Sequence, residues 1–204
     1  MKKYSFNWHF VLILLLFAGS FAQTNQEATE DIYNDAAVFL EIELLRSSVD
    51  QFVTENKEPN FVIANFDEFE SETPKPTWRS FKTREEFNAV NDTSPAYSSA
   101  EIWKIAGKIA RAEFTYTSPS GDWVHYVTYT FRKNGGSAIV ASELRTFYGN
   151  VSVKRTKLFD ENGNLLKACE EIRELGSNKP LTLDEDFVDN EVPVYKNVSE
   201  LPGI

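Results

Sequence analysis

Hydrophobic residues recur with helical spacing from about residue 27 to residue 55. They are spaced four, three, four and three residues apart and form one face, made of Val38, Ile42, Leu45, Val49 and Phe52. No glycine or proline interrupts this stretch, and Pro59 follows it. The pattern predicts one long helix over residues 27–55, with Phe39, Leu40 and Leu44 widening its apolar stripe.

A period of two replaces the helical period over residues 102–175. Pairs of turn-forming residues divide this region at regular intervals, at Ser120-Gly121, Asn134-Gly135, Gly149-Asn150 and Asn162-Gly163. Runs rich in Val, Ile, Thr, Tyr and Phe lie between the pairs, so we predict a meander of five consecutive antiparallel strands. Apolar residues change from odd to even positions at Ala110, which predicts a bulge or bend within residues 107–111.

The remaining segments carry weaker signals. Short strands are predicted at 60–64 and 77–82, and a capping box at Thr83 and Glu86 predicts a short helix that ends at Val90. Residues 176–204 are expected to form an extended acidic tail, in which Val192-Pro193-Val194-Tyr195 docks as an edge strand. The whole pattern predicts an α+β fold: a long N-terminal helix packed on a curved antiparallel β-meander of about five to seven strands.

Charge is distributed unevenly between these predicted elements. Residues 24–58 have a balance of −7, whereas residues 110–158 have a balance of +4. An acidic helix beside a basic sheet favours packing of the one on the other. The formal net charge of the chain is −10, which argues against nucleic acid or an anionic membrane as the main partner.

The first 22 residues have the pattern of a signal peptide. Lys2 and Lys3 precede an apolar run over residues 10–18, and Ser20-Phe21-Ala22 places small residues before Gln23. The alternative is an uncleaved anchor, but the run is about half the roughly 20 residues that a membrane span requires. We therefore expect cleavage before Gln23, export to the periplasm or the medium, no later membrane span, and a single domain over residues 23–204.

Few residues in this chain can carry chemistry. After cleavage His125 is the only histidine and Cys169 the only cysteine, so we expect no disulfide, no metal site and no cofactor. The spacing of Asp160, Asn162, Asn164 and Glu171 is that of a calcium-binding loop, but Leu165 stands where such a loop has glycine. A hairpin turn is the favoured interpretation, and no catalytic residue is assigned.

Aromatic residues are the unusual feature of the composition. Trp123, His125, Tyr129 and Phe131 share one face of a predicted strand, and Trp103 lies upstream. A large aromatic core would explain them. The alternative is a surface that holds an apolar small molecule or a protein segment, and these five residues are its candidate ligand-binding residues.

Three functions are compatible with these patterns. The favoured one is an exported, non-enzymatic binding or accessory protein whose ligand lies on the aromatic sheet face. An envelope protein that pairs through its sheet edge is the second. The third is a carboxylate-based hydrolase, for which Glu113, Asp122 and Glu143 could pair across strands.

Overall fold

The computed structural model describes residues 26–67, 77–182 and 193–204, with side chains from residue 36 onward. The predicted signal peptide therefore lies outside the described residues. These ranges contain two α-helices, α1 (Gln26–Glu55) and α2 (Arg84–Asn91), and two short 3-10 helices, η2 (Tyr148–Asn150) and η3 (Val198–Glu200). The strands are β1 (Phe61–Asn65), β2 (Trp78–Phe81), β3 (Ser98–Ile105), β4 (Lys108–Thr117), β5 (Trp123–Phe131), β6 (Ser137–Thr146), β7 (Val151–Phe159) and β8 (Leu165–Glu174).

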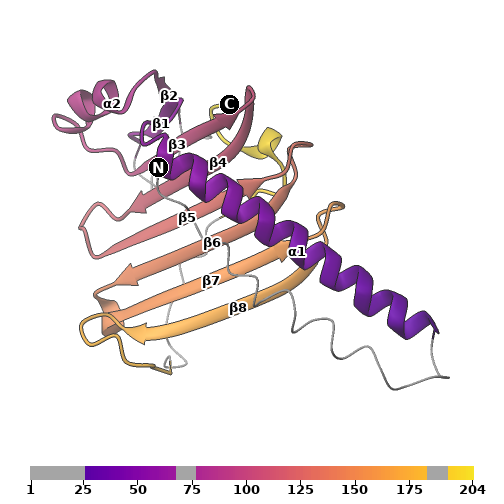
Figure 1. Cartoon of the computed structure of the whole chain (residues 1–204). Coiled ribbons are helices and arrows are strands. Elements are labelled where there is room, and N and C mark those ends of the chain that lie inside the picture. The colour runs from indigo at the N-terminus through magenta and orange to yellow at the C-terminus, as the bar shows by residue number, and fades with distance from the viewer. Residues whose placement is uncertain (1–25, 68–76, 183–192) are drawn as a thin grey trace, which may run out of the picture. The chain divides into compact units, whose positions relative to one another are not determined.

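All eight strands form one antiparallel sheet, which confirms the predicted α+β class. Their order is β2-β1-β3-β4-β5-β6-β7-β8, and Figure 1 shows β3 to β8 side by side in chain order. The predicted count of five to seven strands is wrong by one. The meander holds six strands rather than five, because one turn was missed.

The missed turn is Ala106-Gly107, which joins β3 to β4. Both residues have positive φ, 50° and 79°, and Ile105 pairs with Lys108 across the turn. Two consecutive left-handed residues form a tight hairpin turn, for which Asn-Gly is the usual sequence and Ala-Gly a weak signal. The predicted irregularity is also present, since the register shifts between Trp103 and Lys104 and leaves Ala110 as the extra residue of β4.

The helix α1 buries the predicted stripe. Ile42 and Val49 are fully buried, and Leu45 and Phe52 are half-buried. The prediction that Leu40 and Leu44 widen this stripe is wrong, because these side chains are 61% and 63% exposed. Each lies two residues from Ile42, which is about 200° around the helix.

The part of α1 from Phe39 onward belongs to the same compact unit as the sheet. Asp50 accepts a hydrogen bond from Arg111 at 2.5 Å, and Glu41 pairs with Arg132 at 3.3 Å. These pairs join the acidic helix to basic residues of the sheet, as the charge pattern predicts. We call the sheet face that carries Trp103 and Arg111 the helix face.

The short helix α2 covers β1 and β2 on the helix face. The hydroxyl of Thr83 accepts a hydrogen bond from the Glu86 amide at 3.1 Å, which confirms the predicted helix start. The Glu86 carboxylate in turn accepts a hydrogen bond from the Lys82 amide. In a standard capping box it would accept from the amide of the N-cap residue, which here is Thr83. Apolar side chains of α2 then pack against a small cluster of β1 and β2, made of Val62, Ala64 and Phe81.

The opposite face of the sheet, which we call the aromatic face, carries the main core. Phe114, Val127, Tyr129 and Phe131 are buried there, and the Tyr129 and Phe131 rings stack with centroids 5.9 Å apart. Register places Phe114 opposite Val127, so the side chains of neighbouring strands meet on this face.

The C-terminal residues also pack on the aromatic face. The Tyr195 ring lies 5.9 Å from Phe114 and 5.6 Å from Tyr129, and Leu201 is buried in the same core. The prediction of an edge strand is wrong for residues 193–195, while Val192 lies outside the described ranges. The sheet ends at β2 and β8, and the described C-terminal residues pair with it through an isolated bridge between Gly136 and Asn197. The half-buried Tyr195 ring, which packs on Phe114 and Tyr129, holds this segment over the face of the sheet rather than at its edge.

Candidate functional site

The structure brings four of the five predicted ligand-binding residues together. Trp123, His125, Tyr129 and Phe131 share the aromatic face of β5. Trp103 lies on the helix face instead, where its indole nitrogen donates to the carbonyl of Asn56 at 3.1 Å. A bulky aromatic side chain is favoured on either face of a sheet, so the residue type alone could not predict on which face Trp103 lies.

Burial determines which of these residues a ligand can reach. Tyr129, Phe131 and His125 are buried, and Trp123 is half-buried. The Tyr129 hydroxyl donates to the carbonyl of Pro193 at 2.6 Å, and burial raises the pKa of this phenol well above its usual range. Tyr129 therefore acts as a neutral donor that fastens the C-terminal segment to the core.

A cavity of about 450 Å³ opens beside this core on the aromatic face. Four neighbouring strands, β5 to β8, contribute to it, together with the C-terminal segment. The residues that line it are His125, Val127, Val140, Ser142, Arg155, Lys157, Ala168, Cys169, Glu170 and Val194. Its volume lies within the range typical of small-molecule sites, roughly 300 to 1,000 Å³.

The lining changes from apolar to charged across the sheet. One row of directly paired residues runs Val127, Ser142, Arg155, Glu170 from β5 to β8. The next row runs Tyr129, Val140, Lys157, Ala168. Val127 and Val140 thus provide apolar lining on β5 and β6, beside His125 and Ser142, and both cations lie on β7.

Sequence reasoning missed most of this lining, although β7 carries a usable signal. Its residues on the aromatic face are Val151, Val153, Arg155, Lys157 and Phe159. The first two and the last are buried, whereas the two cations interrupt an otherwise apolar set. Two neighbouring cations on the mostly buried face of a strand that is paired on both sides indicate a polar site, because charged side chains rarely face a core without a partner.

The carboxylates considered for hydrolysis do not face one another across this cavity. Glu113 lies opposite Glu101 on the helix face, where Arg111 pairs with Glu113 at 2.8 Å and Arg84 with Glu101 at 2.5 Å. Burial raises the pKa of Glu113, and Arg111 partly opposes this shift. Each carboxylate of the pair is therefore held by its own arginine rather than left for proton transfer.

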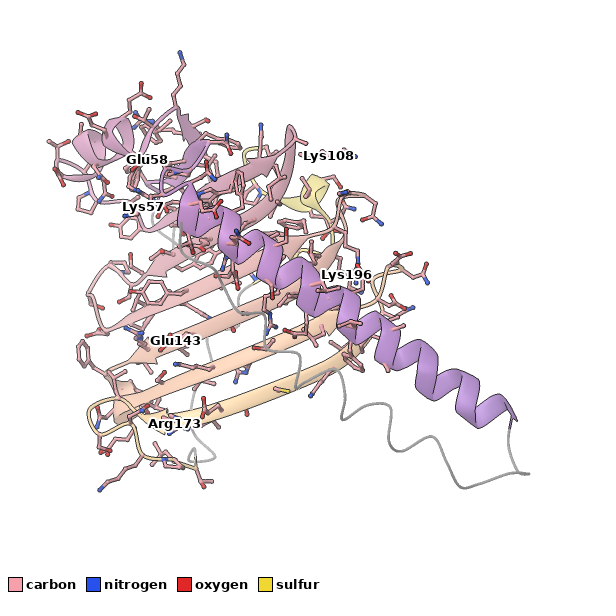
Figure 2. All side chains as sticks on the ribbon, in the orientation of Figure 1. Lys57, Glu58, Lys108, Glu143, Arg173 and Lys196 are labelled. Atoms are coloured by element: carbon pink, nitrogen blue, oxygen red, sulfur yellow. The ribbon has the colours of Figure 1, made fainter. Side chains whose placement is uncertain are left out.

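The other two carboxylates have separate surroundings. Glu143 also lies on the helix face, where a hydrogen bond from Arg145 lowers its pKa, with a further contribution from Lys154. Figure 2 shows Glu143 on β6 and Arg173 on β8, both on this face of the sheet. Asp122 lies in the turn before β5 and accepts a hydrogen bond from the Ser120 hydroxyl at 2.5 Å.

The segment with calcium-loop spacing is a hairpin turn. One carboxylate oxygen of Asp160 accepts hydrogen bonds from the amides of Asn162 and Asn164, at 2.9 and 2.7 Å. These bonds use the carboxylate to close the turn between β7 and β8. Within the described ranges, no group of three or more His, Cys, Asp or Glu side chains is arranged to hold a metal ion.

Cys169 is a free, exposed thiol on β8. The helices in the described part of the chain are all too short or too polar to cross a membrane. No protein-family model, curated protein or solved structure matches this chain. Its function must therefore be argued from the site itself.

Proposed function

We propose that this chain is an exported, non-enzymatic binding protein whose ligand occupies the cavity on the aromatic face. The single observation that supports this most is the cavity of about 450 Å³, whose lining combines valine side chains on β5 and β6 with charged side chains on β7 and β8. Such a combination suits ligand recognition, because apolar surface contributes affinity and a few polar groups fix orientation. The proposed export rests on the signal-peptide pattern of residues 1–22.

Binding is favoured over hydrolysis by the chemistry of the lining. A glycosidase-type site needs two carboxylates that face each other across a cleft. Glu170 is the only carboxylate among the described lining residues, and it accepts a hydrogen bond from Arg155 at 2.6 Å. The described lining therefore offers no second carboxylate to stand across the cleft from Glu170.

A ligand in the cavity is also favoured over a partner protein that pairs with the free edge of β8. That strand carries Lys167, Glu170, Glu171 and Arg173, and charged edges oppose pairing with another chain. At its C-terminal end the chain folds back on it, since the Leu181 amide donates to the carbonyl of Ile172 at 3.1 Å.

The proposal predicts that filling the cavity abolishes binding. Ser142 faces the cavity from β6, so Ser142→Trp places an indole in the ligand's space. Thr156→Trp is the matched control, because Thr156 is also half-buried but lies on the helix face of the adjacent strand. We expect the wild type and Thr156→Trp to bind the neutral fluorescent probe N-phenylnaphthylamine, and Ser142→Trp to lose at least about tenfold in affinity.

Native mass spectrometry of the three proteins, purified from the native host, extends the test to the natural ligand. A co-purifying small molecule should accompany the wild type and Thr156→Trp and be absent from Ser142→Trp. Thermal melts must first show that both variants fold. Equal probe binding by both variants, or no binding by the wild type, would reject the cavity as a ligand site.

A further inference from the structure

The cations of the cavity differ in how they are paired. Arg155 is held by Glu170, at 2.6 Å between Nε and Oε2. Within the described ranges, no ion pair involves Lys157, whose partners across the sheet are Val140 on β6 and Ala168 on β8. Among the described lining residues there are therefore two cations and one carboxylate, in a chain whose formal net charge is −10.

The surroundings of Lys157 indicate how a ligand would be oriented in the cavity. Its two directly opposite neighbours are apolar, and Val127 and Val194 add to the apolar part of the lining. An ammonium beside apolar surface is costly unless an anion accompanies it. A molecule that places an anionic group at Lys157 and an apolar part over Val127 and Val140 would satisfy both halves of the lining at once.

We propose that the ligand is an amphipathic monocarboxylate, of the fatty-acid class, whose carboxylate pairs with Lys157. This inference rests on the proposed function, because it assigns a ligand class to the same cavity. One negative charge balances the excess cation, and the alkyl chain covers the valine side chains. Arg155 stands two residues along β7, about 7 Å away at Cα, and adds its field to the same end of the cavity.

Competition against bound N-phenylnaphthylamine tests this assignment. Dodecanoate and dodecanol have the same alkyl chain and differ in charge, so their ratio of affinities reports the anion site alone. Below the micelle concentration we expect dodecanoate to bind at least about tenfold more tightly, since a charged hydrogen bond contributes roughly this much. Affinity should also rise about fourfold for each methylene added from octanoate to dodecanoate.

Substitution of Lys157 then locates the anion. Lys157→Met keeps the apolar stem and removes the charge, so most of the preference for dodecanoate over dodecanol should be lost. Lys157→Arg should restore the preference for dodecanoate. Lys154→Met is the matched control, because Lys154 lies on the helix face of the same strand, and it should retain the tenfold ratio.

The outcomes separate this inference from the proposed function. If the probe binds and Ser142→Trp excludes it, but dodecanoate has no advantage over dodecanol, the cavity is a binding site and the monocarboxylate assignment is wrong. The assignment is also wrong if Lys157→Met leaves the ratio unchanged. If the wild type does not bind the probe at all, the proposed function fails as well.

Discussion

At the scale of single residues, Arg132 joins separate parts of the fold. Its side chain is 6% exposed, and its guanidinium donates to the carbonyls of Ser137, Asp160 and Phe159 at 3.3, 3.2 and 2.8 Å. It also pairs with Glu41 of α1 at 3.3 Å. One buried cation thus ties the β5–β6 hairpin to the β7–β8 hairpin and to the helix.

Removal of this guanidinium should destabilise the protein strongly. Arg132→Met leaves buried carbonyl groups without a donor, and we expect a loss of about 2 to 4 kcal/mol in the free energy of unfolding. Arg145→Met is the control, because Arg145 pairs with Glu143 at the surface and such pairs contribute within about 1 kcal/mol. Urea unfolding measures both variants, and equal losses would contradict the role assigned to Arg132.

At the scale of elements, the hairpin turns determine which strands pair. Four of the five meander turns contain residue pairs that are typical of turns. The fifth turn, Ala106-Gly107, carries only a weak signal in the sequence. Ala106 has a φ of 50°, a conformation that costs an ordinary L-residue roughly 1 to 2 kcal/mol and Asn much less. The strain persists because the strands on either side are well paired.

Replacement of Ala106 should therefore stabilise the β3–β4 hairpin. Ala106→Asn creates Asn-Gly, the preferred pair for this turn, and should raise stability by about 0.5 to 1 kcal/mol. Ala106→Val places a β-branched residue at the same positive φ and should lower it. Thermal denaturation of the two variants should shift in opposite directions, and shifts of the same sign would argue against the turn geometry.

At the scale of the whole molecule, the helix face contains two glutamates with opposite electrostatic environments. Burial raises the pKa of Glu113, Arg111 opposes the shift, and Glu101 and Asp50 add to it. The pKa of Glu143 is lowered, first by the hydrogen bond from Arg145. Glu113, whose pKa is raised, destabilises the fold once pH rises through its folded pKa. Glu143, whose pKa is lowered, stabilises the fold above its unfolded pKa, and this stabilisation is lost as pH falls through its folded pKa.

The two glutamine variants should consequently have opposite pH profiles. Glu113→Gln removes the penalty of a buried carboxylate and should raise the melting temperature at pH 7. Glu143→Gln removes a stabilised carboxylate and should lower it. The Glu113→Gln difference should disappear as pH falls through the raised pKa of Glu113 to about 4.3, the pKa of an unfolded glutamate. The Glu143→Gln difference should shrink only below about 4.3, because the folded pKa of Glu143 is lowered. Melting curves from pH 3 to 8 check this, and parallel profiles would contradict it.

The sequence alone was enough to predict the elements whose signals are local. The α1 stripe, the Thr83 helix start and the strand alternation from Ala110 onward all depend on residues within a few positions of one another. Helical period, capping and turn chemistry act at that range, so they can be read from the chain without its fold. The aromatic set of β5 was also found this way, and four of the five candidates share a face.

Only the tertiary structure decided which of those residues are core and where a ligand can lie. Val127, Ser142, Arg155 and Glu170 meet because three successive registers align them, and a slip of one residue in any strand would send its side chain to the other face. Tyr195 covers Tyr129 from 66 positions away in the chain numbering, which no local pattern encodes. Local periodicity determines which side chains share a strand face, whereas long-range pairing determines what those faces enclose.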